Sequence, residues 1–234
     1  GIVDEADLID FVASVCRRKM SVGADGLILI ENANDVDFKW QFFNSDGSVA
    51  EMCGNGARCA ARFAYIKGIA GTEMSFETAA GIIHAKVTED QVKINMPDPS
   101  DLKTDYILEL EDSTLSVSSV NTGVPHVVVE SDNIDDIQVV KLGREIRFHN
   151  VFAPAGTNVN FVSLQNDGIV AIRTYERGVE DETLACGTGA IASAIVISYK
   201  KKLKSPVKVV TRGGGYLYIY YKVKQGRFYD IFLE

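Results

Sequence analysis

The stretch that decides the fold occurs twice, as Glu51-Met52-Cys53-Gly54-Asn55-Gly56-Ala57 and as Leu184-Ala185-Cys186-Gly187-Thr188-Gly189-Ala190. Each copy reads Cys-Gly-polar-Gly-Ala and opens an apolar run with helical spacing: Ala60, Phe63, Ala64 and Ile66 in the first, Ile191, Ala194, Ile195 and Ile197 in the second. A single cysteine before a helix is usually structural, so the pairing carries the inference. It predicts a duplicated unit whose halves face one another, each with one thiol at a helix N-terminus. There, unpaired amides and the positive end of the helix dipole favour a thiolate and can hold a carboxylate.

The composition is that of a globular chain with a sizeable core. The 234 residues suit two compact units of roughly 100 to 130 residues each. Hydrophobic residues make up 46% and charged residues 24%, which excludes a disordered chain. A net charge of -8 without a long basic run argues against a nucleic-acid partner, because phosphate binding depends on clustered Lys and Arg. The cluster Lys200, Lys201, Lys202 and Lys204 is interpreted as a solvated helix C-terminus.

The sequence predicts a cytoplasmic protein without a membrane partner. No apolar segment approaches the roughly 20 residues that span a bilayer, and Gly1-Ile2-Val3-Asp4-Glu5 lacks the character of a signal peptide. The four cysteines show no Cys-x-x-Cys spacing, so neither a zinc site nor a disulfide scaffold is expected. Cys16 and Cys59 are expected to be buried thiols.

The predicted elements form two units of similar plan, in an α+β fold with mixed sheets. Pro97-Asp98-Pro99-Ser100-Asp101 is a concentrated breaker segment, so we place the boundary there, with Cys53 in domain 1–97 and Cys186 in domain 98–234. Beside the two Cys-Gly helices, the patterns predict a helix over 5–19 and strands over 27–30, 38–42, 74–78, 82–87, 92–96, 115–120, 127–129, 158–163, 170–175, 207–210 and 216–223.

Two thiols on opposite sides of one bound molecule could move a proton at carbon. Free cysteine, with a pKa of about 8.5, is mostly protonated at neutral pH, and a helix N-terminus can lower that value. One thiolate could remove a proton while the other thiol delivers one from the opposite face, which inverts a stereocentre without a cofactor. The sequence contains no Walker-type loop and no HExxH signature, so we expect acid–base chemistry with no cofactor and no metal.

Five motifs in a fixed order resemble the diaminopimelate epimerase family. They are Asn44-Ser45-Asp46-Gly47-Ser48 followed by Glu51 to Arg58, Gly123-Val124-Pro125-His126, Gly156-Thr157-Asn158-Val159-Asn160-Phe161, Tyr175-Glu176-Arg177-Gly178, and Leu184 to Gly189. The resemblance covers nearly the whole chain. It implies two pseudo-symmetric domains, each wrapping mixed β-sheet around a central helix. It also implies interconversion of LL- and meso-diaminopimelate without pyridoxal phosphate, on the route to lysine and peptidoglycan.

The resemblance implies roles for individual residues as well. Cys53 would be the thiolate base that takes the α-proton of the LL substrate, and Cys186 the acid that reprotonates it. The two helix N-termini would hold the α-carboxylate through Gly54, Asn55, Gly187 and Thr188. The rest of the substrate would be bound by Asn44, Asn158, Glu176 and Arg177, with His126 and Glu176 as supporting polar groups. Diaminopimelate is thus the expected partner, and a homodimer is left open.

Simpler interpretations and departures from the family pattern remain. A histidine after proline is often a satisfied turn residue, Glu176-Arg177 alone would be a surface ion pair, and Asn44 alone would be a turn former.

Many members of the family have Asn where this chain has Val124. The family also begins with a Gly-Asn-Asp-Phe strand and ends with a strand beyond Glu234. We therefore expect the native polypeptide to be longer at both ends. Two other classes stay open: a racemase or isomerase similar to proline racemases or phenazine-biosynthesis isomerases, and a non-catalytic binding or redox protein.

Overall fold

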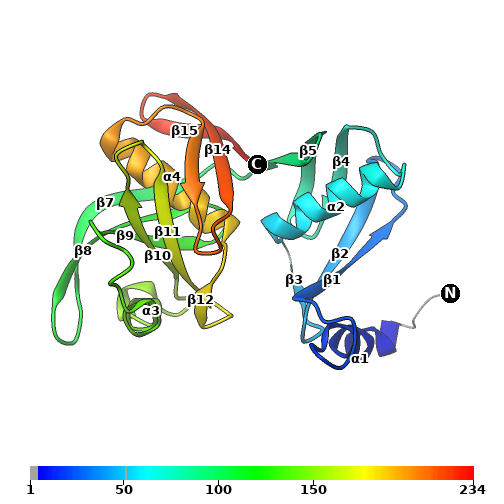
Figure 1. Ribbon diagram of the computed structural model, residues 1–234, viewed down its shortest axis with the longest axis horizontal. Helices are drawn as coiled ribbons and strands as arrows, with labels where there is room; N and C mark the ends of the chain where they lie inside the picture. The colour runs from blue at the N-terminus through cyan, green and yellow to red at the C-terminus, as the bar shows by residue number, and fades with distance from the viewer. Residues whose placement is uncertain (1–4, 51) are drawn as a thin grey trace. The chain divides into compact units, whose positions relative to one another are not determined.

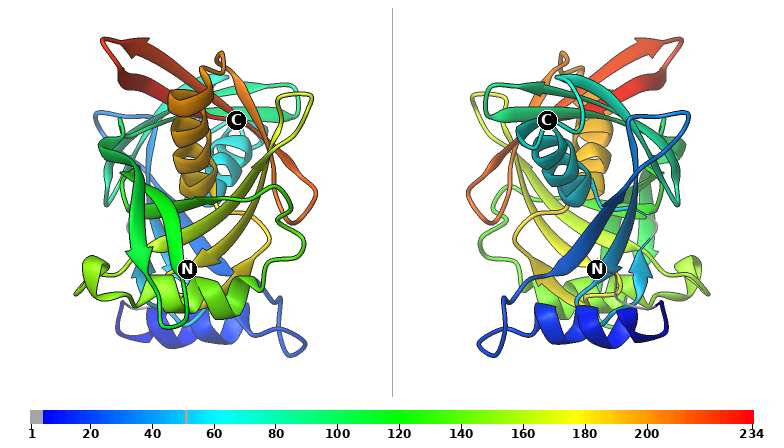
Figure 2. Two further views of the ribbon diagram at one scale, coloured as in Figure 1. Left: turned by 90° about the vertical axis from the view of Figure 1, so that its left-hand side faces the viewer. Right: turned by 90° about the vertical axis from the view of Figure 1, so that its right-hand side faces the viewer.

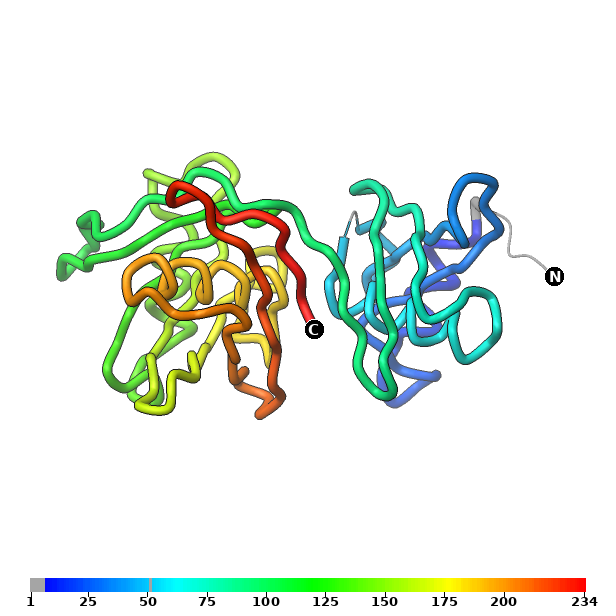
Figure 3. The backbone as a smooth tube through the Cα atoms, turned by 90° about the horizontal axis from the view of Figure 1, so that it is seen from above, coloured from blue at the N-terminus to red at the C-terminus, as the bar shows by residue number. Residues whose placement is uncertain are grey.

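The computed structural model describes residues 5–50 and 52–234. The stretch considered above for a signal peptide therefore lies largely outside the described residues, as does Glu51, the first residue of the first repeat. The chain divides into two compact units, Gly1–Ile94 and Asn95–Glu234. This division lies close to the boundary predicted at Pro97 and falls inside strand β6 (Gln91–Met96). Figure 3 traces the backbone from the first unit into the second.

The first unit combines a mixed sheet with two helices (Figure 1). Strands β1 (Gly26–Glu31) and β2 (Phe38–Asn44) pair antiparallel, and β2 pairs parallel with β4 (Glu73–Thr78). The sheet continues antiparallel through β5 (Gly81–Thr88) and β6 (Gln91–Met96), while the short β3 (Val49–Ala50) pairs with β2. Helix α1 (Glu5–Cys16) precedes β1, and helix α2 (Gly54–Ile66) lies between β3 and β4 in the chain.

Helix α2 contacts β1 and β5 through a stripe of small residues. Its buried side chains are Ala57, Ala60, Ala61 and Ala64. The apolar run predicted for this helix is therefore only half correct, because Phe63 and Ile66 are 48% and 63% exposed. The small alanine side chains allow the helix to approach the sheet closely. The larger apolar side chains lie on the opposite, solvent-exposed side of the helix.

Two further expectations about the first unit are corrected by the structure. Helix α1 ends at Cys16 and not at Lys19, because the amides of Gly23 and Ala24 return to the carbonyls of Val15 and Cys16 and close the helix end. Lys19 itself has a φ of 66°, outside the helical region. Cys16 is buried as expected, but Cys59 is exposed, since it lies outside the alanine stripe of α2.

The second unit is built on a long curved sheet. Its strands follow the spatial order β15-β14-β13-β11-β10-β9-β8-β7, with β12 paired to β11. The β9–β10 and β11–β13 pairs are parallel, whereas β7–β8, β8–β9, β10–β11, β11–β12, β13–β14 and β14–β15 are antiparallel. The bounds are β7 (Ser100–Glu109), β8 (Thr114–Asn121), β9 (Pro125–Glu130), α3 (Val139–Arg147), η1 (Asn150–Phe152), β10 (Asn158–Leu164), β11 (Val170–Glu176), β12 (Asp181–Thr183), α4 (Gly187–Lys201), β13 (Val207–Val210), β14 (Tyr216–Lys224) and β15 (Arg227–Leu233).

Helix α4 is the centre of this unit. The sheet curves around it, and the strands that contact it are β8, β9, β10, β11, β13, β14 and β15 (Figure 2). The apolar run predicted for this helix is confirmed, since Ile191, Ala194, Ile195 and Ile197 are all buried. Helix α3 covers the other face of β10 and β11, where Ile146 and Tyr175 are among the buried residues of a second core.

The basic end of α4 differs from the prediction of a fully solvated helix terminus. Lys200 donates to the carboxylates of Asp105 and Glu130, and its side chain is only 20% exposed. Two acidic side chains from β7 and β9 thus bind the last turn of the helix. Lys202 ends it in the left-handed conformation, with a φ of 57°.

Candidate active site

Cys53 occupies the N-cap position of α2. Its backbone is extended, with φ -142° and ψ 115°, and its Sγ accepts a hydrogen bond of 3.4 Å from the amide of Gly56. Ser, Thr, Asp and Asn are the usual residues at this position, because their oxygens are good acceptors. Gly54 and Asn55 follow in the first turn, where backbone amides lack an intrahelical acceptor. The local fold therefore places a thiol beside free amide donors, as the repeat predicted.

A guanidinium lies close to this cap. Arg58 donates from Nη2 to Oδ1 of Asn55 over 2.7 Å. Burial lowers the pKa of Arg58, while negative charge on Cys59 and Cys53 acts in the opposite direction. Arg58 was not among the predicted site residues, although its i+3 spacing from Asn55 on a helix indicates that the two side chains meet. A nearby cation favours the thiolate form of a cysteine.

Asn44 ends β2 and takes part in a tight turn. Its side-chain Nδ2 donates to Oγ of Ser48 over 3.0 Å, and its carbonyl accepts from the amide of Gly47. Asp46 Oδ1 accepts from both the amide and the hydroxyl of Ser48, and these bonds lower the pKa of Asp46. The contacts of Asn44 are those of a turn residue, and a role in binding substrate remains a prediction.

Cys186 occupies the corresponding N-cap position of α4. Its backbone is again extended, with φ -128° and ψ 113°, and the thiol is buried. Its Sγ lies 3.5 Å from Oγ1 of Thr188. The carbonyl of Thr188 accepts a bond of 3.1 Å from the hydroxyl of Thr122, which holds the first turn of α4 against the end of β8. Each repeat thus presents one cysteine in the same local frame.

A buried polar network lies under the Cys186 helix. Asn160 on β10 bonds through Nδ2 to the carbonyl of Val127, over 3.0 Å, and to Nδ1 of His126, over 3.1 Å. Its Oδ1 accepts from the hydroxyl of Thr174 on β11, over 3.0 Å. A Cβ added at Gly189 would lie 2.4 Å from that same Oδ1 and 3.3 Å from Sγ of Cys186. The network therefore reaches the first turn of α4, and only glycine fits between it and the helix.

His126 is buried in β9 and is not a turn residue. It is 1% exposed, and its Nε2 has no hydrogen-bond partner among residues 5–50 and 52–234. Burial, assisted by the charge of Arg177, lowers the pKa of His126 to about 3. The imidazole is therefore neutral at physiological pH. Asn160 and Thr174 were missed as partners, although an Asn inside an apolar strand is an unusual residue that could have been noticed.

Asn158, Glu176 and Arg177 meet where β10 and β11 leave the sheet core. Asn158 donates from Nδ2 to the carbonyl of Pro125, over 3.2 Å, and accepts at Oδ1 from the amide of Arg177, over 2.8 Å. Burial raises the pKa of Glu176, and the hydroxyl of Thr183, 2.9 Å from Oε2, opposes that rise. Arg177 donates from Nη1 to the carbonyl of Ala155. Glu176 and Arg177 thus use their side chains on different partners and are not the surface ion pair considered above.

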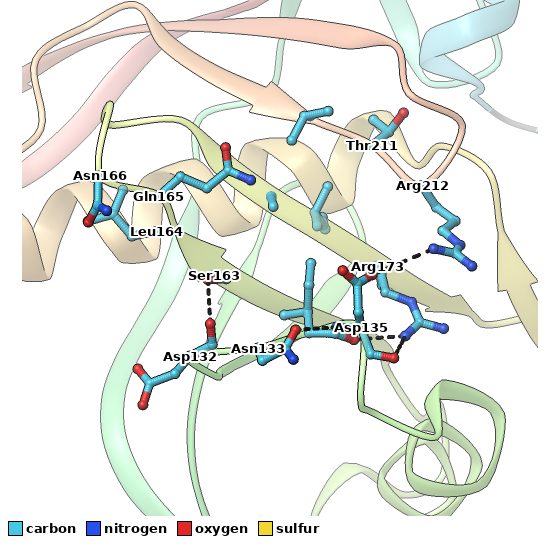
Figure 4. A pocket seen from close by; sticks show the side chains of 14 residues that line it. Asp132, Asn133, Asp135, Ser163, Leu164, Gln165, Asn166, Arg173, Thr211 and Arg212 are labelled. Atoms are coloured by element: carbon cyan, nitrogen blue, oxygen red, sulfur yellow. Dashed lines mark hydrogen bonds and ion pairs between the residues drawn. The ribbon is translucent and has the colours of Figure 1, made fainter.

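A separate pocket of about 460 Å³ lies in the second unit (Figure 4). Its lining includes Arg173, which alternation along β11 places on the opposite face from Thr174. The Arg173 guanidinium is held by Glu182, over 2.7 and 2.8 Å, and by the carbonyls of Ile134 and Ile137. None of the site residues proposed from the sequence lines this pocket. This pocket is therefore stabilised by structural ion pairs.

Within the described residues, no group of three or more His, Cys, Asp or Glu side chains could hold a metal ion. No helix in that part of the chain is long and apolar enough to cross a membrane.

The amino-acid sequence of this chain is similar to those of known proteins. A family model described as diaminopimelate epimerase matches residues 2–101 and 118–229. The diaminopimelate epimerase of Aquifex aeolicus is 51% identical over 252 residues, covering 96% of this chain and 87% of the relative. That of Archaeoglobus fulgidus is 43% identical over 225 residues, covering 91% of this chain and 79% of the relative.

Solved structures of lower identity share the fold. A phenazine biosynthesis protein of the PhzF family from Bacillus anthracis superimposes with a TM-score of 0.75 at 15% identity, covering 99% of this chain and 85% of that chain. A probable proline racemase from Agrobacterium radiobacter, with bound carbonate, gives 0.71 at 16% identity, covering 95% and 76%. These likenesses confirm the predicted fold class, with two repeats of mixed sheet around a helix.

Proposed function

The chain belongs to the diaminopimelate epimerase family, and from that premise we propose that it interconverts LL- and meso-diaminopimelate by moving a proton at the α-carbon. Cys53 takes the α-proton of the LL isomer, and Cys186 delivers a proton to the opposite face of the same carbon. The carbon inverts, and the reaction needs no pyridoxal phosphate. The observation that carries the proposal is the N-cap position of both cysteines. The reaction would supply precursors of lysine and peptidoglycan.

The first helical turns favour the ionised groups that this chemistry requires. A thiolate at an N-cap lies beside amide donors and the positive end of the helix dipole. At Cys53 the Arg58 guanidinium adds a nearby positive charge. The same amides, those of Gly54 and Asn55 in α2 and Gly187 and Thr188 in α4, would hold the reacting α-carboxylate. Negative charge that develops on this carboxylate in the transition state is then stabilised by donors already in place.

The polar residues at the end of β11 would bind the rest of the substrate. Glu176 offers a carboxylate for an ammonium group, and Arg177 offers a guanidinium for a second carboxylate. Asn158 already uses one Nδ2 hydrogen and one Oδ1 lone pair on the backbone, so one hydrogen and one lone pair remain for a ligand. Asn44 would add an amide from the first unit, and His126 would support the Cys186 side.

We further propose that the enzyme acts in the cytoplasm without a nucleic-acid or membrane partner, consistent with its net charge of -8. A homodimer is the assembly to be tested, by light scattering of the purified protein. A mass equal to one chain would exclude it.

Proton exchange tests the reaction and the substrate together. In deuterated water, NMR of LL-diaminopimelate with the protein should show loss of the α-proton signal and appearance of the meso isomer. Cys53→Ala and Cys186→Ala should each abolish epimerisation, because one thiol cannot serve both faces of the carbon. Cys59→Ala is the matched control, since it removes an exposed thiol from the same helix as Cys53. It should leave the rate unchanged.

Two outcomes would contradict the proposal. If Cys186→Ala kept near-normal epimerisation, the two-base mechanism would be wrong. If L-proline exchanged its α-proton and diaminopimelate did not, the reaction class would hold and the substrate would be wrong.

A further inference from the structure

The amide of Asn160 has a fixed orientation. Its Nδ2 lies 3.0 Å from the carbonyl oxygen of Val127, and a carbonyl can only accept. Its Oδ1 lies 3.0 Å from the hydroxyl of Thr174, which donates to it. Exchanging the two amide atoms would set Oδ1 against the Val127 carbonyl. The nitrogen of Asn160 therefore faces β9, where His126 lies.

This orientation determines where the imidazole carries its proton. Nδ2 of Asn160 is 3.1 Å from Nδ1 of His126, and an amide nitrogen can only donate. Nδ1 must therefore accept. A neutral imidazole carries one N–H, which is then at Nε2. Burial and the positive charge of Arg177, the charged group that acts on this ring, keep the imidazole neutral by lowering the pKa of His126.

The Nε2–H donor is buried and unused within the residues that the structure describes. A buried donor without an acceptor costs free energy, and the few such groups in native proteins are explained by strain, by a catalytic role or by an ordered water or ion. The site of action is close by, because the position of a Cβ at Gly189 lies 2.4 Å from Oδ1 of Asn160 and 3.3 Å from Sγ of Cys186. The network that orients the ring thus touches the helix turn that carries the thiol.

We infer that Asn160 is a positioning residue, anchored by Thr174, that holds His126 as the neutral Nε2–H tautomer so that the ring offers bound diaminopimelate one hydrogen-bond donor. The inference rests on the proposed function for the identity of the ligand, but the tautomer follows from the geometry alone. A neutral donor suits a site of proton transfer between thiols. It stabilises negative charge on the substrate without adding a third acid or base that competes for the proton.

The tautomer can be observed directly in protein labelled with ¹⁵N-histidine. The chain has three histidines, His84, His126 and His149. Replacing His84 and His149 by Gln leaves the ring-nitrogen signals of His126 alone, so they can be assigned without changing the buried site. We expect the ¹⁵N pattern of a neutral ring protonated at Nε2, without titration between pH 5 and pH 8. Addition of meso-diaminopimelate should shift the Nε2 resonance.

Asn160→Asp keeps the size of the side chain but replaces the amide donor to Nδ1 of His126 by a carboxylate, which can only accept. A carboxylate cannot donate, so the imidazole should change to the Nδ1–H tautomer or become charged, and its ¹⁵N pattern should change accordingly. The value of kcat/KM should fall about ten- to a hundredfold, the effect of losing a hydrogen bond to a charged group. Asn166→Asp is the matched control, because it adds the same charge to an exposed loop of the same unit. It should change neither the ¹⁵N pattern nor the rate.

Each result decides the inference. A wild-type ring protonated at Nδ1, or one that titrates near pH 6.5, would overturn it even if Asn160→Asp failed to fold. An unchanged ¹⁵N pattern in folded Asn160→Asp, or a Nε2 resonance that does not respond to diaminopimelate, would also overturn it. Failure of the proposed function is a different result, since wild-type protein would then show no exchange of the α-proton whatever the tautomer.

Discussion

Gly189→Ala is expected to damage the second unit far more than Gly56→Ala damages the first, although the two glycines are equivalent positions of the repeat. An alanine Cβ at 189 would lie 2.4 Å from Oδ1 of Asn160, closer than such atoms approach. At 56 the nearest atoms are those of Ile28 and Trp40, at 3.4 Å, which is close to ordinary contact.

The magnitude follows from what must move. Asn160 is anchored on both sides of its amide, so the new methyl group breaks or bends hydrogen bonds worth about 1 kcal/mol each. Overpacking adds about 1 to 3 kcal/mol, and replacing glycine in a helix returns about 0.5 to 1 kcal/mol. We therefore expect Gly189→Ala to lower the free energy of unfolding by about 2 to 4 kcal/mol. Gly56→Ala should change it by less than about 1 kcal/mol.

Urea unfolding measures both variants against the wild type. Far-UV circular dichroism follows the whole chain, and the fluorescence of Trp40, the one tryptophan, follows the first unit. Activity gives a second measurement, because the Cβ would also lie 3.3 Å from Sγ of Cys186 and displace the thiol. A shift of a reacting group lowers kcat, here by about tenfold or more, while KM changes less. If Gly189→Ala were as stable and as active as Gly56→Ala, the close packing of Asn160 against α4 would be refuted.

Three further predictions concern single hydrogen bonds and charges. Thr183→Val removes the donor to Glu176 and should raise the pKa of Glu176 further, which moves the acid limb of the kcat/KM profile to higher pH; Thr183→Ser should restore it. Because the pKa of His126 is about 3 when folded and about 6.5 when unfolded, the unfolded state binds more protons, and this group lowers stability as pH falls below 6.5, by about 1.4 kcal/mol per pH unit. Urea midpoints at pH 7 and pH 5 should therefore differ less in His126→Gln than in the wild type. Lys200→Ala should destabilise the second unit by roughly 1 kcal/mol by leaving two carboxylates adjacent, whereas the exposed Lys201→Ala should not, and equal unfolding midpoints would contradict this.

Regular patterns explain which elements could be predicted from the sequence. Strands such as β5, in which Ile83, Ala85 and Val87 are buried in alternation, can be predicted from this two-residue period. The strands that were not predicted lack a regular alternation of apolar and polar residues. In β15, Asp230 has a φ of 56°. Strand β7 begins inside the Pro97–Asp101 breaker segment and has few buried side chains. Helix α3 was missed as well, although Val139, Leu142 and Ile146 recur at helical spacing within its 9 residues.

Some residues of the candidate site could likewise be predicted from the sequence, and others could not. The positions of Cys53 and Cys186 follow from a local motif, so the sequence could place both at helix starts. The partnership of Asn160 with Thr174 depends on the register of β10 against β11, in which these two residues are directly opposite. Its contact with His126 depends on the parallel pairing of β9 and β10. No local pattern contains such long-range register, and the network therefore had to be found in three dimensions.

The N-cap sulfur of Cys53 gives the first unit a trade-off between activity and stability. A serine oxygen there would accept the Gly56 amide more strongly and begin α2 more firmly, but it would be a far weaker base. The helix therefore starts on an acceptor whose strength changes whenever the sulfur gains or loses a proton. Hydrogen exchange of the Gly56 amide should therefore be slower in protein whose Cys53 sulfur is a thiolate than in protein whose sulfur is a thiol.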